Sequence, residues 1–287
     1  MGARFRFGDG PLHGEVHMKF AICNEMFEGW EFDRVCAAAR QAGYAGVELA
    51  PFTLGKPAGE VSAQERRSLR DAALRQGVEI AGIHWVLAHT EGFHINSPDA
   101  AVRNRTVSYL IDLVNLCADI GGAVMVFGSP KQRNVCEGLS RQDAWCLARQ
   151  TFQAVVPTLE DRGVTFCLEP LSPVETDFIN TGEEAAAMIR EVGSANFQLL
   201  LDVKAMSSET KQIPQIIAEN AGVLKHFHAN DANLRGPGFG DVDFTPIAAA
   251  LKKIGYDGWV SVEVFDFSPD PVTIANESIK YLNSVFD

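Results

Sequence analysis

The sequence predicts a single domain folded as a (β/α)8 barrel. Eight short apolar runs alternate with helical patterns, and seven of those patterns end in a glycine shortly before the next apolar run. Glycine just past a helix end adopts the left-handed cap conformation without steric cost. The seven glycines are Gly43, Gly77, Gly121, Gly163, Gly193, Gly222 and Gly255. Eight alternations in about 250 residues fit a barrel of the usual size.

The eight apolar runs are predicted to be strands. Most are continuous rather than alternating in polarity, which is typical of parallel strands covered on both faces. We expect the strands at residues 20–24, 46–49, 80–84, 123–128, 164–169, 197–202, 224–228 and 259–264.

Helix start signals support the segments between these strands. Capping-box spacing occurs at Ser62 with Glu65 and at Thr181 with Glu184. A cap followed by proline occurs at Ser97-Pro98 and at Thr245-Pro246, and the last helix is expected over residues 271–285. The alternative, a doubly wound open sheet, would place a glycine-rich phosphate turn after the first strand. Residues 25–30 hold a single glycine there, so the barrel is preferred.

Length and composition limit the classes of function. The chain has 287 residues, of which 46% are apolar and 22% charged, as is ordinary for a globular protein. Its formal net charge of -12 disfavours a nucleic-acid partner, because phosphate backbones bind basic faces. No apolar run reaches the length of about 18 residues that a membrane span requires, so no membrane partner is expected.

The cysteines and the N-terminus give expectations about compartment and domain limits. None of the six cysteines forms a C-x-x-C pair, which predicts free thiols and a cytoplasmic protein. Residues 1–17 lack the apolar core of a signal peptide and are predicted to be a loose extension. The barrel domain is then expected over residues 18–287, and a homo-oligomer stays open.

Polar residues stand where six of the predicted strands end, on the face where barrels build their active sites. They are Glu48, His84, Glu169, Asp202, His228 and Glu263. The last four end consecutive strands, and each would be costly to bury alone. A divalent cation between them would make them mutually tolerable. Three carboxylates and one imidazole suit Mn²⁺, Mg²⁺, Co²⁺ or Zn²⁺. The alternative is that each carboxylate pairs separately with a nearby lysine or arginine.

The seventh predicted strand runs into a glycine-rich loop, and residues 225–244 read KHFHANDANLRGPGFGDVDF. We expect only one of its two histidines to face the barrel interior. His228 is predicted to be that residue because it is nearer the strand end, with His226 packed behind the strand.

These motifs resemble those of the xylose-isomerase-like sugar isomerase and epimerase superfamily. Its members include D-tagatose 3-epimerase, hydroxypyruvate isomerase, inosose dehydratase and, more distantly, endonuclease IV. The resemblance extends from about residue 18 to the C-terminus and rests on Glu169 in LEP, Asp202 in LLLD, His228 in HFHAND with the following PGFG, and Glu263 in SVEV. It implies one divalent metal ion on these four residues, with Glu169 and Glu263 also acting as acid and base.

That chemistry suits a sugar, keto-sugar or polyol. One carboxylate removes a proton next to a carbonyl and another returns it, while a metal ion stabilises the charge that develops on oxygen. Carboxylates on the fifth and eighth strands would flank a flat substrate, which permits epimerisation as well as isomerisation.

The substrate contacts follow the family pattern less closely. In the epimerases a histidine follows the strand-six aspartate by three residues, and this chain has Ala205 there. A family glutamate matches at Glu175. The position of a family arginine falls on Leu234, so the adjacent Arg235 is predicted to contact substrate. Lys204 is a candidate replacement donor, although an exposed lysine at a helix start is preferred.

Other residues have two interpretations each. Glu48 is expected to bind a sugar hydroxyl or an adjacent arginine, and His84 to bind substrate or to be a satisfied interior histidine. Lys131 and Arg133 form either an anion site or a solvated loop. Three aromatic residues are expected to form an apolar wall for a sugar: Phe27, Trp30 and Trp85.

Three classes of function follow from these residues. The preferred one is a metal-dependent sugar isomerase or epimerase. The second is a dehydratase of the inosose or dehydroshikimate type, in which the same base removes the proton and a β-hydroxyl leaves. The third is a non-catalytic metal- or sugar-binding protein, motivated by Ala205. An endonuclease IV-like enzyme is disfavoured because the further histidines of its three-metal site are missing at Ala205 and at residues 241–243.

Overall fold

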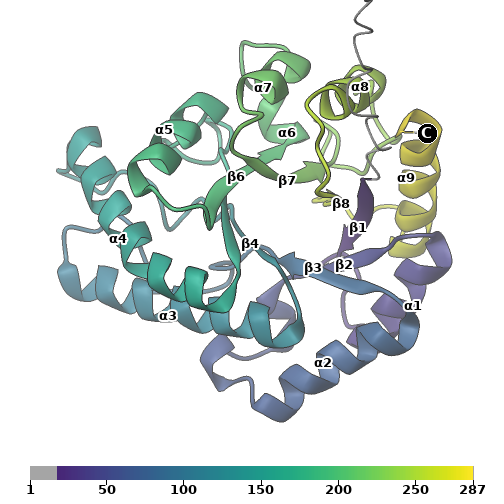
Figure 1. The fold of residues 1–287 in the computed structure, drawn as a ribbon, viewed down its shortest axis with the longest axis horizontal. Coiled ribbons are helices and arrows are strands. Elements are labelled where there is room, and N and C mark those ends of the chain that lie inside the picture. Colours follow the sequence, from purple (N-terminus) through teal and green to yellow (C-terminus); the bar gives the residue numbers. More distant parts are fainter. Residues whose placement is uncertain (1–17, 287) are drawn as a thin grey trace, which may run out of the picture.

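The structure is a computed structural model that describes residues 18–286. Eight parallel strands close into a barrel in sequence order, with β1 paired to β8, and helices form a ring around it (Figure 1). The predicted single (β/α)8 barrel is therefore confirmed. The predicted extension at residues 1–17 lies outside the described residues.

All eight predicted strands are present. They are β1 (Lys19–Cys23), β2 (Gly46–Leu49), β3 (Glu79–Ile83), β4 (Val124–Phe127), β5 (Thr165–Leu168), β6 (Phe197–Asp202), β7 (Leu224–Ala229) and β8 (Trp259–Val262). β5 and β8 end before the predicted carboxyl ends, so that Glu169 and Glu263 directly follow their strands. These carboxylates consequently stand on the rim of the barrel.

The helices lie between the strands as expected. The α-helices of the described chain are α1 (Phe32–Ala42), α2 (Ala63–Gln76), α3 (Ala100–Ile120), α4 (Arg141–Arg162), α5 (Gly182–Val192), α6 (Val203–Met206), α7 (Ile213–Glu219), α8 (Thr245–Lys253) and α9 (Pro271–Phe286). Two short 3-10 helices, η1 (Pro51–Leu54) and η2 (Ala58–Glu60), follow β2. None of the described helices is long and apolar enough to cross a membrane.

Two of the predicted caps form and two were wrong. Ser62 forms the complete capping box of α2, and the Thr181 hydroxyl accepts from the backbone N–H of Glu184 in α5. α3 is capped by Asp99 instead of Ser97, because the Ser97 hydroxyl accepts from the Asp99 N–H in the turn before the helix. α8 begins at Thr245 itself, after Phe244.

The predicted glycine stops are mostly confirmed. Left-handed caps occur at Gly43, Gly77, Gly121, Gly163 and Gly193. α7 and α8 differ, because their cap positions are Asn220 and Ile254, and Gly222 and Gly255 come later.

The barrel interior is apolar on one side and polar on the other. Alternate residues of a strand face the same way, so the positions below Glu169 and Asp202 are Cys167 and Leu200. These two form a small buried apolar cluster with Val124 and Val126 of β4. The strands from β7 round to β2 instead bury polar residues: His226, His228, Ser261 and Glu48. The polar half of the interior adjoins the candidate site.

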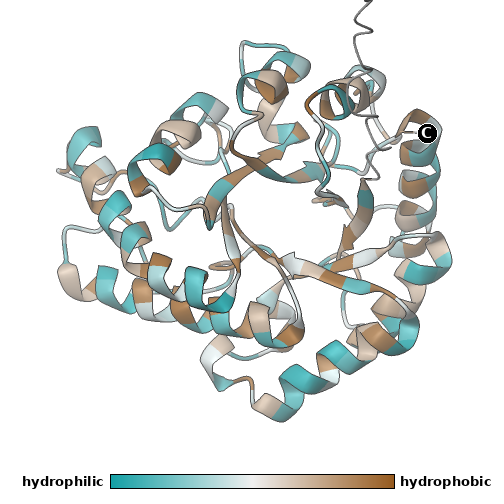
Figure 2. Cartoon of the chain, in the orientation of Figure 1, coloured by the Kyte–Doolittle hydropathy of each residue, from teal (hydrophilic) through white to brown (hydrophobic). Residues whose placement is uncertain are grey.

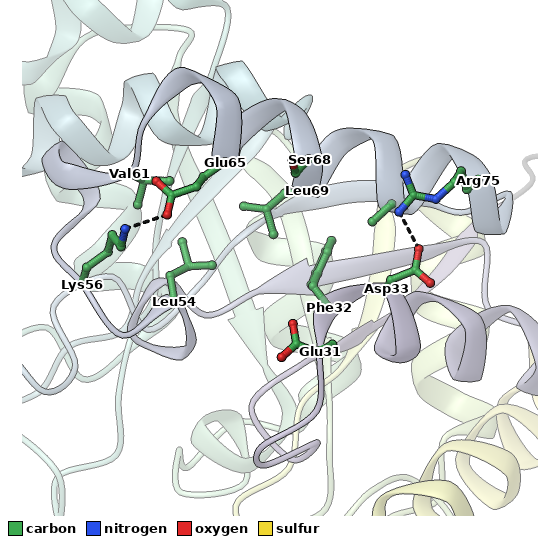
Figure 3. A pocket seen from close by; sticks show the side chains of 11 residues that line it. Glu31, Phe32, Asp33, Leu54, Lys56, Val61, Glu65, Ser68, Leu69 and Arg75 are labelled. Carbon is green, nitrogen blue, oxygen red and sulfur yellow. Dashed lines mark hydrogen bonds and ion pairs between the residues drawn. The ribbon is translucent and has the colours of Figure 1, made fainter.

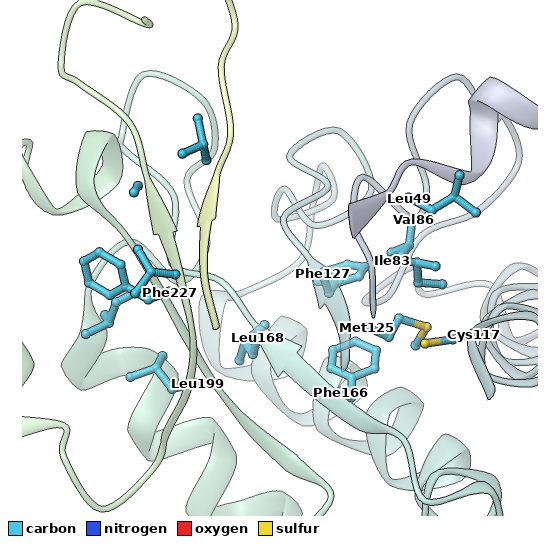
Figure 4. Close-up of a cluster of buried hydrophobic side chains, with 14 of the residues drawn as sticks. Leu49, Ile83, Val86, Cys117, Met125, Phe127, Phe166, Leu168, Leu199 and Phe227 are labelled. Atoms are coloured by element: carbon cyan, nitrogen blue, oxygen red, sulfur yellow. The ribbon is translucent and has the colours of Figure 1, made fainter. Parts of the chain in front are cut away.

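A larger apolar core lies between the strands and the surrounding helices. Phe152 of α4 packs against Phe127, Phe166 and Phe197, with ring centroids 5.7, 5.4 and 5.0 Å apart. Figure 4 shows Phe127 and Phe166 within this core, and Figure 2 shows hydrophobic residues along the strands with hydrophilic ones on much of the helical ring. This packing fixes the strands whose ends position the site.

Candidate active site

Four side chains converge at the carboxyl ends of the last four strands. Glu169 follows β5, Asp202 ends β6, His228 lies in β7 and Glu263 follows β8. All four are buried, and each offers one ligand atom that lies within 4.8 Å of the others. The structure thus brings together the four residues that the sequence placed at successive strand ends.

The donor set fits a divalent metal ion. Three carboxylates and an imidazole provide the oxygen and nitrogen ligands that such ions bind. Burial, reinforced by the charge of Glu263, raises the pKa of Asp202 to about 6, although Lys204 and His228 act in the opposite direction. Burial and repulsion from Glu263 and Asp202 raise the pKa of Glu169 well above its ordinary value. A bound cation would offset this repulsion.

The alternative of separate lysine or arginine partners does not fit the contacts. In the described part of the chain, the ion pairs formed by the four residues join His228 to Glu263 and to Glu48. Arg133 approaches Glu169 only at its main-chain oxygen, which it contacts at 2.7 Å. The carboxylates therefore form one cluster.

Glu263 is held on both of its oxygens. The indole N–H of Trp85 donates to Oε1 at 2.7 Å, and His228 Nδ1 lies 3.1 Å from Oε2. Burial alone would raise the pKa of Glu263, but the charge and hydrogen bond of His228 outweigh it and lower that pKa. Trp85 holds a left-handed backbone conformation with φ of 50°, which is uncommon for a residue with a side chain.

Glu169 occupies space that only a glycine at position 128 leaves free. A Cβ at Gly128, just beyond β4, would lie 1.8 Å from Glu169 Oε2. Gly128 is therefore part of the site, because the absence of a side chain there leaves room for Glu169. This role was not predicted from the sequence.

Asp202 is oriented by the first turn of α6 and by Asn230. Its Oδ1 accepts from the backbone N–H of Ala205 at 2.7 Å, and its Oδ2 accepts from the side-chain amide of Asn230. Asn230 is buried, and its own carbonyl oxygen accepts from the N–H of Lys204 at 2.7 Å. This role was not predicted from the sequence, although Asn230 stands two residues after the predicted histidine ligand.

The expectation that His226 packs behind β7 was wrong. Residues two apart on a strand point to the same face, so His226 and His228 both face the interior. Both contact Glu48, with His226 Nε2 2.8 Å from Oε2 and His228 Nε2 3.1 Å from Oε1. All three side chains are fully buried.

Glu48 and His84 lie away from the open cavity. Among the described residues Glu48 contacts neither an arginine nor the cavity. Its partners are the two histidines of β7 and, at 3.8 Å from Oε1, Nδ1 of His84. His84 Nε2 lies 2.7 Å from Glu25 Oε2, and His84 is fully buried. The geometry favours the interior-histidine interpretation of His84.

A cavity of about 700 Å³ opens above the four-residue cluster. Its lining includes Glu169, Glu263, Glu175 and Lys204. Lys204 contradicts the expectation of an exposed lysine, because its side chain is only 11% exposed. The α6 helix directs its ammonium toward Glu175 Oε1 at 2.7 Å, 4.0 Å from the ring centre of Phe265.

The two predicted arginines form contacts of other kinds. Arg235 Nε donates to Asp266 at 2.9 Å, and Arg235 is not among the residues that line the cavity. Arg133 is fully buried, with its terminal nitrogens donating to the main-chain oxygens of Glu169 and Phe127 at 2.7 Å each. Arg133 is therefore neither part of a solvated loop nor free for an anion. Lys131 is exposed and lines the cavity.

The predicted aromatic wall is divided between two cavities. Trp85 stacks between Phe52 and Phe265, with both ring centroids 5.8 Å away. It lines the cavity above the cluster and also a neighbouring cavity of about 650 Å³, to which Phe27 and Trp30 belong. Trp85 thus separates the two spaces.

A further hollow of about 330 Å³ lies over α1 and α2, outside the barrel mouth (Figure 3). Four of its five charged residues form the pairs Lys56–Glu65 and Arg75–Asp33, which the figure marks, and the fifth is Glu31. Because the two pairs neutralise both cations of the hollow at the surface, no site is assigned there.

Comparison with known proteins agrees with this geometry. The xylose isomerase-like TIM barrel family matches residues 36–285, which is most of the chain. The chain belongs to this family. The resemblance found in the sequence is thereby confirmed.

Named relatives within the family are sugar epimerases. An L-ribulose 3-epimerase of Mesorhizobium japonicum is 28% identical over 235 residues, which cover 82% of this chain and 76% of that protein. A D-psicose 3-epimerase of Ruminiclostridium cellulolyticum is 28% identical over 177 residues, which cover 60% of this chain and only 59% of the relative. These relatives support the predicted class of sugar isomerase or epimerase.

Solved structures confirm the fold. The D-psicose 3-epimerase with D-tagatose from Clostridium cellulolyticum H10 matches with a TM-score of 0.82 and 20% identity, covering 94% of this chain and 100% of that chain. An Escherichia coli 3-keto-D-glucoside 4-epimerase matches with a TM-score of 0.81 and 19% identity, covering 93% and 100%.

Proposed function

We propose that this protein is a divalent-metal-dependent sugar epimerase that acts next to the carbonyl of a ketose or related keto-sugar. One observation carries the proposal. Two buried glutamates from different strands, Glu169 and Glu263, line one cavity and belong to one four-residue ligand cluster. The relatives named as D-psicose and L-ribulose 3-epimerases favour 3-epimerisation over the other reactions that this site permits.

Glu169, Asp202, His228 and Glu263 would hold the metal ion. When bound, the ion would polarise the carbonyl and so acidify the adjacent C–H bond. The donor set accepts Mn²⁺, Mg²⁺, Co²⁺ or Zn²⁺.

Proton transfer belongs to the two glutamates. β5 and β8 are three strands apart in the ring, so their carboxylates approach a flat substrate from different sides. One removes the proton and the other returns it on the opposite face. Their pKa values move in opposite directions, since burial raises that of Glu169 while His228 overcomes burial at Glu263. Opposite shifts suit an acid and base pair.

Lys204 and Glu175 line one side of the cavity, and we assign substrate binding to this side, called the Lys204–Glu175 wall. Ala205 leaves no donor at the position of the epimerases' histidine, and the neighbouring Lys204 places an ammonium group in the cavity. We assign Lys204 a hydrogen bond to a substrate oxygen, with Glu175 holding its ammonium group at 2.7 Å. Arg235 is not part of this wall.

Deuterium incorporation tests the proposal. Protein loaded with Mn²⁺ is incubated in D₂O with a panel of ketoses that includes D-psicose and L-ribulose, and exchange next to the carbonyl is followed by NMR. We expect exchange that chelation abolishes and that Glu169→Gln and Glu263→Gln each slow by about 10²–10⁴-fold. Glu60→Gln, at an exposed position in η2, is the matched control. Absence of exchange over the whole panel, or an undiminished rate in Glu169→Gln, contradicts the proposal.

The proposal also covers the cellular location of the protein and its oligomeric state. The six free cysteines of the chain support a reducing, cytoplasmic location. A homo-oligomer stays a prediction, which light scattering of the purified protein measures.

A further inference from the structure

We infer that Glu48 and His226 are positioning residues that hold His228 with its proton on Nε2, leaving Nδ1 free as the metal ligand. The inference deepens the proposed function and rests on its metal centre. It assigns a role to the buried polar half of the barrel, which the acid-base chemistry does not use.

His228 lies between two carboxylates with different surroundings. Its Nδ1 is 3.1 Å from Glu263 Oε2, and its Nε2 is 3.1 Å from Glu48 Oε1. Glu263 belongs to the four-residue cluster and lines the cavity, whereas Glu48 does neither. The nitrogen on the metal side is therefore Nδ1.

The tautomer follows from the chemistry of Glu48. An ionised carboxylate only accepts hydrogen bonds, and a neutral imidazole has one N–H and one lone pair. If Nε2 donates to Glu48, the lone pair is on Nδ1 and faces the cluster. Carboxylates beneath metal-binding histidines fix ring orientation in this way, and their loss typically weakens metal binding by about 10–100-fold.

Glu48 is itself held by His226. It is fully buried, and a carboxylate in such a place requires hydrogen-bond donors. His226 Nε2 lies 2.8 Å from Oε2, so each oxygen of Glu48 faces one imidazole of β7. The two imidazole rings are 5.2 Å apart at 75°, a separation that lets one carboxylate reach both.

Small residues on the intervening strands make this contact possible. β1 and β8 lie between β2 and β7 in the ring. In register with Glu48 and His228 they carry Cys23 and Ser261, whose Sγ and Oγ atoms are 3.5 Å apart. Larger interior side chains at these two positions would fill the space across which Glu48 reaches β7.

The test compares Mn²⁺ affinity, measured by electron paramagnetic resonance, in matched variants. An amide cannot accept from both histidines, so Glu48→Gln is expected to lower affinity by about 10–100-fold. His226→Leu removes the donor to Glu48 and is expected to lower Mn²⁺ affinity. His226→Gln keeps an N–H donor and is expected to bind Mn²⁺ more tightly than His226→Leu. Glu79→Gln is the control, because Glu79 is an exposed residue of β3 whose ion pair is with Lys19, away from the metal centre.

A second measurement needs no variant. In wild-type protein labelled with ¹⁵N-histidine and loaded with diamagnetic Zn²⁺, His228 is expected to show a protonated Nε2 and a metal-bound Nδ1. A metal-bound Nε2, or Glu48→Gln affinity within twofold of wild type, overturns the inference. If wild-type protein binds no Mn²⁺, the proposed function itself is refuted.

Discussion

Replacing Gly128 by alanine perturbs the site by a single methyl group. Gly128 lies just beyond β4, and its missing side chain leaves the space that the Glu169 carboxylate occupies. The substitution changes no charge and removes no hydrogen-bonding group. It therefore isolates the position of Glu169 from its chemistry.

The expected effect follows from one distance. An added Cβ would lie 1.8 Å from Glu169 Oε2, whereas ordinary contacts begin near 3.4 Å. The carboxylate must retreat by about 1.6 Å, and a misplacement of about 1 Å at a catalytic group costs about 10²-fold in rate. We expect kcat/KM to fall at least that far and Mn²⁺ affinity to fall as well. Overpacking is expected to cost about 1–3 kcal/mol of unfolding free energy.

The assay combines Mn²⁺ titration, solvent deuterium exchange and thermal unfolding. Gly222→Ala is the matched control, because a Cβ there would meet no atom within 4 Å. Gly128→Ala with Glu169→Asp shortens the displaced side chain and is expected to recover the lost stability without recovering the rate. If Gly128→Ala keeps wild-type Mn²⁺ affinity and exchange rate, Glu169 does not act from the position described.

Three further predictions concern neighbouring groups. Lys204→Met keeps the length of the side chain but removes the donor held by Glu175. Because a hydrogen bond to a charged group contributes about 1.5–3 kcal/mol, KM is expected to rise by about 10–100-fold at unchanged Mn²⁺ affinity. An unchanged KM contradicts this prediction. Trp85→Phe removes the N–H that donates to Glu263 at 2.7 Å. The pKa of Glu263 is therefore expected to rise, and the acidic limb of the pH profile of kcat/KM to move to higher pH. If that limb does not move, the Trp85 hydrogen bond does not stabilise the ionised form of Glu263. Because burial raises the pKa of Asp202 to about 6, protons compete with the metal below that pH, and Mn²⁺ affinity is expected to fall as pH drops from 7 to 5; a flat titration is the contrary result.

The sequence predicted the parts of this protein that depend on local pattern. Continuous apolar runs and glycine caps are each recognisable within a short segment of sequence, and together they were enough to predict the barrel fold. Glu169, Asp202, His228 and Glu263 could be grouped because parallel strands all end on one face of a barrel. The rule required only the position of each residue within its strand.

The features that were missed depend on contacts between distant segments. Glu48 and His226 are 178 residues apart, and their contact depends on small side chains on the two strands between them. The error on His226 came from the period of a strand, since alternate residues share a face. Lys204 was expected to be exposed because it stands at a helix start. The direction of its side chain is set by α6 and by its partner Glu175, and the sequence around Lys204 does not show either contact.

Anomalous diffraction at the manganese edge, from crystals soaked in MnCl₂, tests the central claim most directly. The account predicts one strong peak per chain, bounded by Glu169, Asp202, His228 and Glu263, whose candidate ligand atoms already lie within 4.8 Å of one another. Two other groups of the described residues lie within reach of a metal and are expected to stay empty: Cys23 with Glu25 and His84, and Cys23 with Glu48 and His228. An absent peak at the four-residue cluster, or a peak only at one of the other two groups, would contradict the account.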